Sequence, residues 1–342
     1  MQYLFYFLYA GILPLSLIKR DRNARELYIV SAWIFIVFSI FLFSTNTTGT
    51  DYLNYKYIFN SIPIITSFSM KGHTELGFQL LISIVKTFGL GYTQFLFIFQ
   101  SILAFLIIKS YKQVTPYWIL ALWLYFPKYV MQGHLNQIRI VVVYATMIFA
   151  IPLIKNNKLF LYIRNAIVSA FFHISGVIII PVYLYFKSKS DRKISILLVL
   201  ISMVLGQLIF IVLFRIASSY SIRGAKYILD GAGETSSFSL TVIRRMILFC
   251  YGLLIYPYAK RNQPYFNVIW NIFVASVCFY FMFMKMPILA ERIGAIFSVV
   301  EPLIIISVIY VLKPESRIWG YLFILFYGLS DVILRGLLPY SL

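Results

Sequence analysis

The feature that most constrains the fold of this chain is the spacing of its apolar residues. They fall in blocks of about 15 to 24 between short charged clusters, and spanning the core of a bilayer takes about 20 apolar residues. Only 12% of the residues are charged, whereas a soluble domain carries about 25%. The pattern predicts an all-α, polytopic transmembrane protein with about 10 to 12 membrane segments, including one or two re-entrant or broken helices. No linker or internal repeat divides the chain, so residues 1–342 are expected to form a single transmembrane domain.

The apolar blocks give a set of candidate spans. The first is interpreted as a retained span, because it lacks the basic start and the cleavage site of a signal peptide. The candidates are 3–18, 27–44, 94–108, 117–131, 138–154, 194–214, 242–258, 265–284, 289–311 and 318–338.

Basic residues set the orientation, because cytoplasmic loops of membrane proteins are enriched in Lys and Arg. Most basic clusters lie between spans, at 19–25, 109–112, 155–158, 187–193, 260–261 and 313–317. They can all be cytoplasmic only if residues 76–90 dip into the outer face and residues 159–186 enter and return around His173. The net charge of +19 is therefore attributed to orientation and to anionic lipids rather than to nucleic acid.

This topology gathers polar residues at the outer boundary of the membrane. The groups are 49–55 with Glu75, the stretch QGHLNQIR at 132–139, the loop 215–241 with Arg244 and Arg245, and 285–292 with Glu301. In QGHLNQIR, Gln132, Asn136 and Arg139 are spaced i, i+4 and i+7, which predicts that they share one helical face.

Arginine near the middle of a membrane costs about 2.5–3.5 kcal/mol, so it is seldom placed there without a partner. A guanidinium group binds phosphate oxygens through two parallel hydrogen bonds, so arginines at the outer boundary indicate a lipid-linked phosphate or pyrophosphate. The alternatives are that Arg139 extends to the interface, that Arg292 pairs with a buried carboxylate, that Asp51 caps a helix and that His173 is a core residue.

Metal and nucleotide chemistry have little support. The three histidines show no metal-ligand spacing, and neither a P-loop nor a Rossmann fingerprint is present. We therefore expect no metal and no cofactor.

Several segments also follow a known order: GTDYLNYKYIF (49–59), ELGFQLLISIVKTFGLG (75–91), NQIRIVVVYATMIFA (136–150), AFFHISGVIIIPVYLY (170–185), IRGAKYILDGAG (222–233) and AERIGAIFSVVEPLII (290–305). Together they resemble the EpsG/Wzy-type polysaccharide polymerase family, whose pattern Arg139, His173 and Arg292 match. The chain departs from the pattern where the family often has Arg-Gln, here Arg139-Ile140. It departs again where the family has an element similar to acidic-Pro-Gly-Phe, because this chain has Glu75-Leu-Gly-Phe78 there.

The resemblance implies a metal-independent glycosyltransferase of the bacterial inner membrane. It would polymerise undecaprenyl-pyrophosphate-linked oligosaccharide repeat units at the periplasmic face, into O-antigen of lipopolysaccharide, capsule or exopolysaccharide. Its partners would be that lipid-linked oligosaccharide, membrane lipids and a chain-length regulator protein, with no nucleic acid.

On this hypothesis the site residues divide by role. The pyrophosphate would be bound by Arg139, Arg223, Arg292 and Lys226, because fixed cations stabilise charge that develops on a leaving group. The base for the acceptor hydroxyl would be His173, Glu75 or Asp51, which the sequence does not rank. Further substrate contacts would come from Tyr52, Tyr55, His134, Asn136, Gln137 and Tyr227, although the tyrosines are equally suited to anchoring the interface.

Two other functions fit the same composition. A flippase for the lipid-linked oligosaccharide would line a central cavity and show repeats, whereas the polar groups here favour one face. A different polyprenyl-phosphate-dependent membrane transferase would usually carry paired acidic residues in its first outer loop, where only Asp51 is found.

Overall fold

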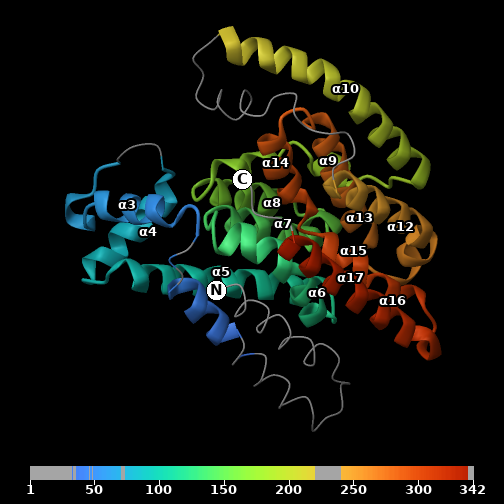
Figure 1. Ribbon diagram of the computed structural model, residues 1–342, viewed down its shortest axis with the longest axis horizontal. Coiled ribbons are helices and arrows are strands. Elements are labelled where there is room, and N and C mark those ends of the chain that lie inside the picture. The colour runs from blue at the N-terminus through green and yellow to red at the C-terminus, as the bar shows by residue number, and fades with distance from the viewer. Residues whose placement is uncertain are drawn as a thin grey trace. The chain divides into compact units, whose positions relative to one another are not determined.

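The computed structural model describes residues 33, 36–45, 47, 49–70, 74–219 and 240–337 (Figure 1). Within these ranges every regular element is a helix. The helices are Ile36–Thr45, α3 (Tyr52–Ser61), η1 (Ile65–Ser67), α4 (Leu76–Thr87), α5 (Tyr92–Val114), α6 (Trp118–Tyr125), η2 (Phe126–His134), α7 (Ile140–Lys155), α8 (Leu159–Ala170), η3 (Ile174–Ile179), α9 (Tyr183–Lys187), α10 (Arg192–Ser219), α12 (Leu240–Asn262), α13 (Phe266–Met282), α14 (Pro287–Ser298), α15 (Glu301–Ile306), α16 (Val308–Val311), η4 (Pro314–Ser316) and α17 (Arg317–Leu337). The candidate span 3–18 and the start of 27–44 lie outside the described residues.

Among the described helices, α5, α10 and α12 are each long and apolar enough to cross a membrane. A fourth span is formed if α14 counts together with α15 and α16, which are bent from it by 46°. This bend was not predicted, because the sequence pattern gave 289–311 as one continuous span. Its cause is local: Pro302 lies in the first turn of α15, where its missing N–H cannot extend the helix before it. Shorter apolar helices include α4, α7, α8 and α13. The all-α, polytopic membrane architecture predicted from the sequence is confirmed.

Internal contacts divide the chain into two compact units. Unit 1 comprises residues 1–153, 158–180 and 322–342, and unit 2 comprises residues 154–157 and 181–321. The expectation of one transmembrane domain stays a prediction.

Figure 1 labels α3, α4 and α5 in unit 1, and the core around these helices is built from aromatic rings. Phe78 of α4 lies 5.5 Å from Phe95 and 5.4 Å from Phe99, both on α5, between ring centroids. Phe59 of α3 lies 5.5 Å from Phe95. These edge and offset contacts are the arrangements that aromatic pairs prefer, and they fix α3 and α4 on α5.

Lys86 joins the end of α3 to α4. Its ammonium donates to the carbonyl oxygens of Phe59 (3.2 Å), Asn60 (3.3 Å) and Ile62, which are at or next to the last turn of α3. A cation there satisfies carbonyls that the helix leaves unpaired and lies at the negative end of its dipole.

Replacing Lys86 by methionine should therefore lower the free energy of unfolding by about 1–3 kcal/mol, because charged hydrogen bonds are lost at nearly constant side-chain volume. Thermal unfolding of the purified protein in one detergent measures the change. Lys109→Met, on the exposed face of α5, is the control and should change little; equal melting temperatures for the two variants would contradict the role given to Lys86.

The stretch 159–179 folds back on itself. The Tyr162 hydroxyl of α8 donates to the Ile179 carbonyl oxygen at the end of η3, and a Cβ at Gly176 would lie 2.4 Å from Ser169 Oγ. The chain therefore reverses between Ala170 and Ile174, where the sequence predicted a reversal around His173. The entry of this hairpin into the membrane stays a prediction. The helix α4 is also short: its 12 residues extend roughly 18 Å, less than the bilayer core of about 30 Å.

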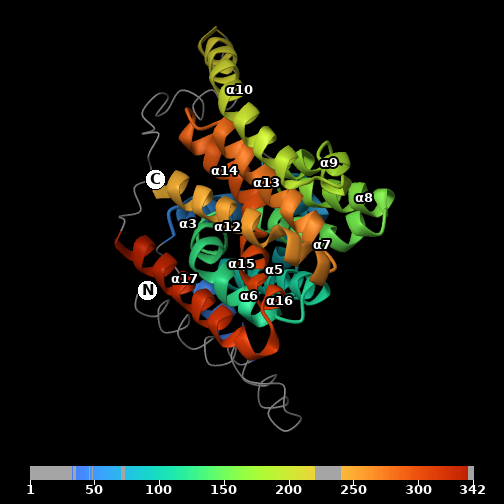
Figure 2. The ribbon, with the colours of Figure 1, turned by 90° about the vertical axis from the view of Figure 1, so that its right-hand side faces the viewer.

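Unit 2 is organised around α13, which lies beside α10, α12 and α14 (Figure 2). Trp270 of α13 stacks on Phe249 of α12 at 5.5 Å and donates to Ser195 Oγ of α10 at 2.8 Å. The neighbouring Asn271 is buried and donates to the Ser188 carbonyl oxygen just beyond α9 (2.8 Å). Only 17% of the apolar stretch of α10 is buried, as expected for a helix that faces lipid.

Candidate functional site

Arg139 and Glu75 form an ion pair in unit 1. Arg139 directly precedes α7 and Glu75 directly precedes α4; a guanidinium N–H of Arg139 donates to Oε2 of Glu75. The side chains are 19% and 17% exposed, so the pair is half-shielded from the surroundings. Oε1 of Glu75 accepts a hydrogen bond from the Ile174 backbone N–H at 3.1 Å. One carboxylate thus joins three segments that are distant in the sequence.

The backbone around Gly77 holds this junction in place. The Gly77 N–H donates to the Phe171 carbonyl oxygen at 2.8 Å, so the first turn of α4 lies against the reversal that contains His173. A Cβ at position 77 would lie 2.8 Å from that oxygen, closer than real Cβ contacts allow. Only glycine permits this approach.

Gly77→Ala should therefore separate α4 from residues 171–174 and lower the free energy of unfolding by about 1–3 kcal/mol. Polymer formation should fall with it, because Glu75 would lose its hydrogen bond from Ile174. The control is Gly91→Ala, whose Cβ would meet only the end of the flexible Gln94 side chain, at 3.0 Å. Thermal unfolding and activity are measured for both, and indistinguishable variants would contradict the proposed role of Gly77.

Arg139 retains hydrogen-bonding capacity beyond its ion pair. Its guanidinium carbon lies 5.7 Å from the ring centroids of both Tyr55 and Phe78, within the range of cation–π attraction. Its Nε is buried and has no hydrogen-bond partner among the described residues. Burial raises the pKa of the Tyr55 hydroxyl, and the adjacent Arg139 guanidinium acts in the opposite direction. The arrangement is a fixed cation with an unused donor beside an aromatic wall.

The loop before α3 belongs to the same junction. Thr50 donates to Asn136 Oδ1 from its backbone N–H (2.9 Å) and from its hydroxyl (3.1 Å). Asp51 occupies the N-cap position of α3, but its side chain makes no capping hydrogen bond. Its charge acts on Tyr55, whose pKa it helps to raise. Tyr52 packs edge-on against Tyr92, 5.5 Å away.

His173 caps the N-terminus of η3. Its Nδ1 accepts a hydrogen bond from the Ser175 backbone N–H at 3.3 Å. An accepting Nδ1 places the proton of the neutral ring on Nε2. In this tautomer Nε2 is a donor, and the ring offers no second lone pair to act as a base.

The predicted helical face in QGHLNQIR is wrong. The helix η2 ends at His134 and α7 begins at Ile140, so Asn136 and Arg139 lie in turns. The reason is the π-helical geometry of η2, in which each backbone N–H donates to the carbonyl oxygen five residues earlier. The same spacing continues into the turn, where the Gln137 N–H donates to the Gln132 carbonyl oxygen (3.0 Å). The role of Gln137 in substrate binding stays a prediction.

His134 is buried in unit 1 and its ring nitrogens are occupied by other side chains. Its Nδ1 lies 2.7 Å from Gln100 Oε1 and its Nε2 lies 3.3 Å from the Tyr125 hydroxyl. Its predicted contact with substrate stays a prediction, but no described interaction directs the ring toward the Arg139 junction.

In unit 2, Arg292 lies on α14 and is half-buried, and its predicted role at the pyrophosphate stays a prediction. Arg223, Lys226 and Tyr227 lie outside the described residues. The roles of His173, Glu75, Asp51, Tyr52 and Tyr55 are likewise untested, although the structure places all of these in unit 1.

Sequence reasoning assigned no role to a second set of charges, in unit 2. Arg244 Nη2 lies 3.3 Å from Glu301 Oε2 at the break before α15. Arg245 is 2% exposed; it donates to Ser276 Oγ (3.3 Å) and lies 4.4 Å from the Tyr280 ring centroid. The available signal was the Arg244-Arg245 pair at the start of an apolar run, since ionisable residues inside a membrane mark function.

The fold and these charged junctions define a polytopic, all-α membrane protein with arginine–carboxylate pairs held between its helices. The chain matches the EpsG family over residues 3–341 and belongs to that family. EpsG proteins are Wzy-type polysaccharide polymerases, so the resemblance seen in the sequence is confirmed. Comparisons with curated proteins and with solved structures give no significant match.

Proposed function

We propose that this protein polymerises oligosaccharide repeat units linked to undecaprenyl pyrophosphate, at the periplasmic face of the bacterial inner membrane. Membership of a polysaccharide polymerase family supports the reaction class. The observation that carries the proposed site is Arg139, which Glu75 holds in place while its Nε has no partner among the described residues. A diphosphate oxygen is the acceptor that such a donor fits.

The reaction transfers a glycan from one lipid to another. The bond between the anomeric carbon of the donor glycan and a pyrophosphate oxygen breaks, and a bond from that carbon to an acceptor hydroxyl oxygen forms. The hydroxyl proton passes to a base, and undecaprenyl pyrophosphate leaves with the electron pair of the broken bond. Fixed donors at the leaving oxygen lower the barrier, because they stabilise charge that is larger in the transition state than in the substrate.

The local hydrogen bonds support one of the three candidate bases over the other two. Both oxygens of Glu75 already accept hydrogen bonds, from Arg139 and Ile174. The His173 ring uses its lone pair on Ser175, which suits donation to a phosphate oxygen better than proton removal. Asp51 makes no capping bond, so we assign it as the base.

The assignment of Asp51 has its own test. Asp51→Asn should lower kcat by about 10²–10⁴-fold, as for loss of a general base, with a small change in KM for the lipid-linked donor. Asp191→Asn is the control, since Asp191 caps α10 through the Ile194 N–H. If Asp51→Asn polymerises at the wild-type rate, the base is another group.

The function itself is tested with purified wild-type protein in lipid nanodiscs, supplied with lipid-linked repeat units and analysed by gel. A ladder of polymer lengths is the expected product. In cells that lack the protein, single repeat units should accumulate in the outer leaflet. Accumulation in the inner leaflet, with no ladder from the purified protein, would indicate a flippase and overturn the proposal.

A further inference from the structure

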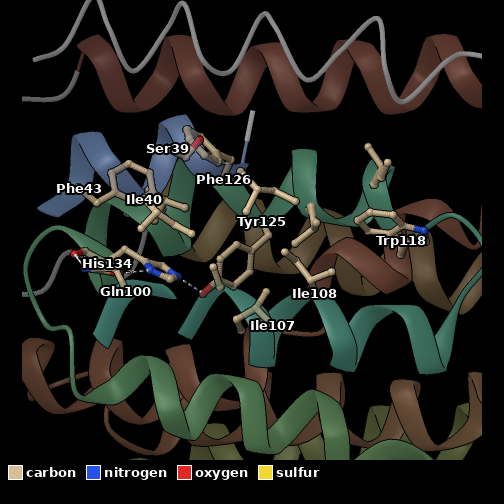
Figure 3. A pocket seen from close by; sticks show the side chains of 15 residues that line it. Ser39, Ile40, Phe43, Gln100, Ile107, Ile108, Trp118, Tyr125, Phe126 and His134 are labelled. Atoms are coloured by element: carbon tan, nitrogen blue, oxygen red, sulfur yellow. Dashed lines mark hydrogen bonds between the residues drawn. The ribbon is translucent and has the colours of Figure 1, made fainter. Parts of the chain in front are cut away.

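Unit 1 contains an apolar cleft a short distance along the chain from Arg139 (Figure 3). The space between its walls, including the open mouth, is about 690 Å³. Nearly all of the surface that lines it is carbon. The lining residues come from the helix Ile36–Thr45, α5, α6 and η2, and include Ile40, Ala104, Ile107, Trp118, Phe126 and Val130.

The polar groups at one end of the cleft face one another rather than the cavity. Figure 3 shows the His134 ring between Gln100 and the Tyr125 hydroxyl. The Gln100 side-chain amide also donates to the His134 carbonyl oxygen at 2.7 Å. Polar groups that are hydrogen-bonded to one another in this way are not available to bind a sugar, so the cleft suits an apolar ligand.

The position of the cleft along the chain selects the ligand. The helix η2 supplies Phe126, Val130 and His134 to the wall, and Arg139 follows His134 by five residues, which span at most roughly 17 Å. A ligand whose pyrophosphate is bound at Arg139 has its apolar tail attached covalently to that group. The tail of such a ligand would begin within this reach of the cleft wall, so it could enter the cleft without a separate binding event.

We propose that this cleft binds the isoprene units of the polyprenyl chain nearest the pyrophosphate that Arg139 holds. The inference rests on the proposed function for the identity of the lipid. If the cleft binds these isoprene units, the protein recognises the tail of its substrate as well as the headgroup. Methyl-branched isoprene units match walls of branched aliphatic and aromatic side chains.

The test fills the cleft from α5. Ala104→Phe places a ring in the cavity, whereas the control Ile102→Phe places the same ring on the exposed face of the same helix, where Ile102 is 41% exposed. Binding of undecaprenyl pyrophosphate to the full-length protein in phosphatidylcholine nanodiscs should weaken at least about tenfold for Ala104→Phe alone, because the ring takes the place of the tail and its packing contacts with the walls are lost. Binding of inorganic pyrophosphate should not change. Arg139→Ala should weaken binding of both.

A second measurement needs no substitution, which matters if Ala104→Phe does not fold. An undecaprenyl pyrophosphate analogue with a photoreactive group in its first isoprene unit should label residues within 36–43, 100–108 and 118–134. Labelling confined to other residues would overturn the proposal, as would wild-type affinity in Ala104→Phe or equal competition by phosphatidylglycerol. If Arg139→Ala loses polymer while Ala104→Phe binds normally, the tail site is wrong and the proposed function stands.

Discussion

Arg139→Ala should abolish polymer formation while leaving the protein folded in the membrane. The loss expected in kcat/KM is about 10²–10³-fold, the usual effect of removing one fixed donor from a developing anion. Arg139→Lys should recover only part of the activity, because an ammonium is a point charge that cannot bind two oxygens in parallel. Single repeat units should accumulate in both variants.

The measurement is the product ladder from purified variants at matched protein concentration. Arg164→Ala is the control, since Arg164 lies in the same unit on the exposed face of α8, and its ladder should match the wild type. Glu75 is 17% exposed, so it can be hydrated once its partner is removed, and the melting temperature of Arg139→Ala should fall only slightly. A normal ladder from Arg139→Ala would remove Arg139 from the mechanism.

The fold class could be read from the sequence because the signal is local. Twenty apolar residues in a row have few other solutions in a membrane, so α5, α10 and α12 appear where the pattern predicts them. The reversal at His173 was also readable, since residues 159–186 are too long for one untilted span and the flanking basic clusters need the same side.

Part of the junction in unit 1 was predicted for a similar reason. The topology places the loop 49–55, Glu75, Arg139 and His173 on one side of the membrane. The structure joins Glu75 to Arg139 and to the residue after His173, and it joins the loop to Asn136. The contacts themselves were not readable. That Gly77 meets Phe171 depends on a backbone approach between segments about a hundred residues apart, which no local pattern records.

The helical face in QGHLNQIR shows where periodicity fails. Spacing of i, i+4 and i+7 assumes 3.6 residues per turn, but η2 is π-helical and ends inside the stretch. Asn136 is instead fixed by Thr50, a partner from another part of the chain. Arg245 was placed among the outer polar residues but given no role, because its neighbours Ser276 and Tyr280 lie on α13, far along the chain.

Arg245→Met should stabilise the fold and impair the function. Arg245 is 2% exposed, and its Nε and Nη2 have no hydrogen-bond partner among the described residues; the Glu291 carboxylate is 3.9 Å from Nη2. Buried donors without partners cost about 1–3 kcal/mol each, and replacing a buried charge by an apolar side chain of similar volume is often stabilising by about 1–4 kcal/mol. The contacts with Ser276 and Tyr280 would be lost, so we expect a net gain of about 1–2 kcal/mol.

A comparison of Arg245→Met with Arg261→Met, both on α12, tests whether Arg245 destabilises the fold. Arg261→Met lies in the exposed last turn of α12 and should lower stability by a few tenths of a kcal/mol, because it removes a cation from the negative end of the helix dipole. Thermal unfolding and the product ladder are measured for both variants. A higher melting temperature with loss of polymer in Arg245→Met would mean that the chain keeps a destabilising charge for its chemistry. A melting temperature below that of Arg261→Met would show instead that Arg245 holds α12 to α13, because only a structural role predicts that the fold weakens when the guanidinium is removed.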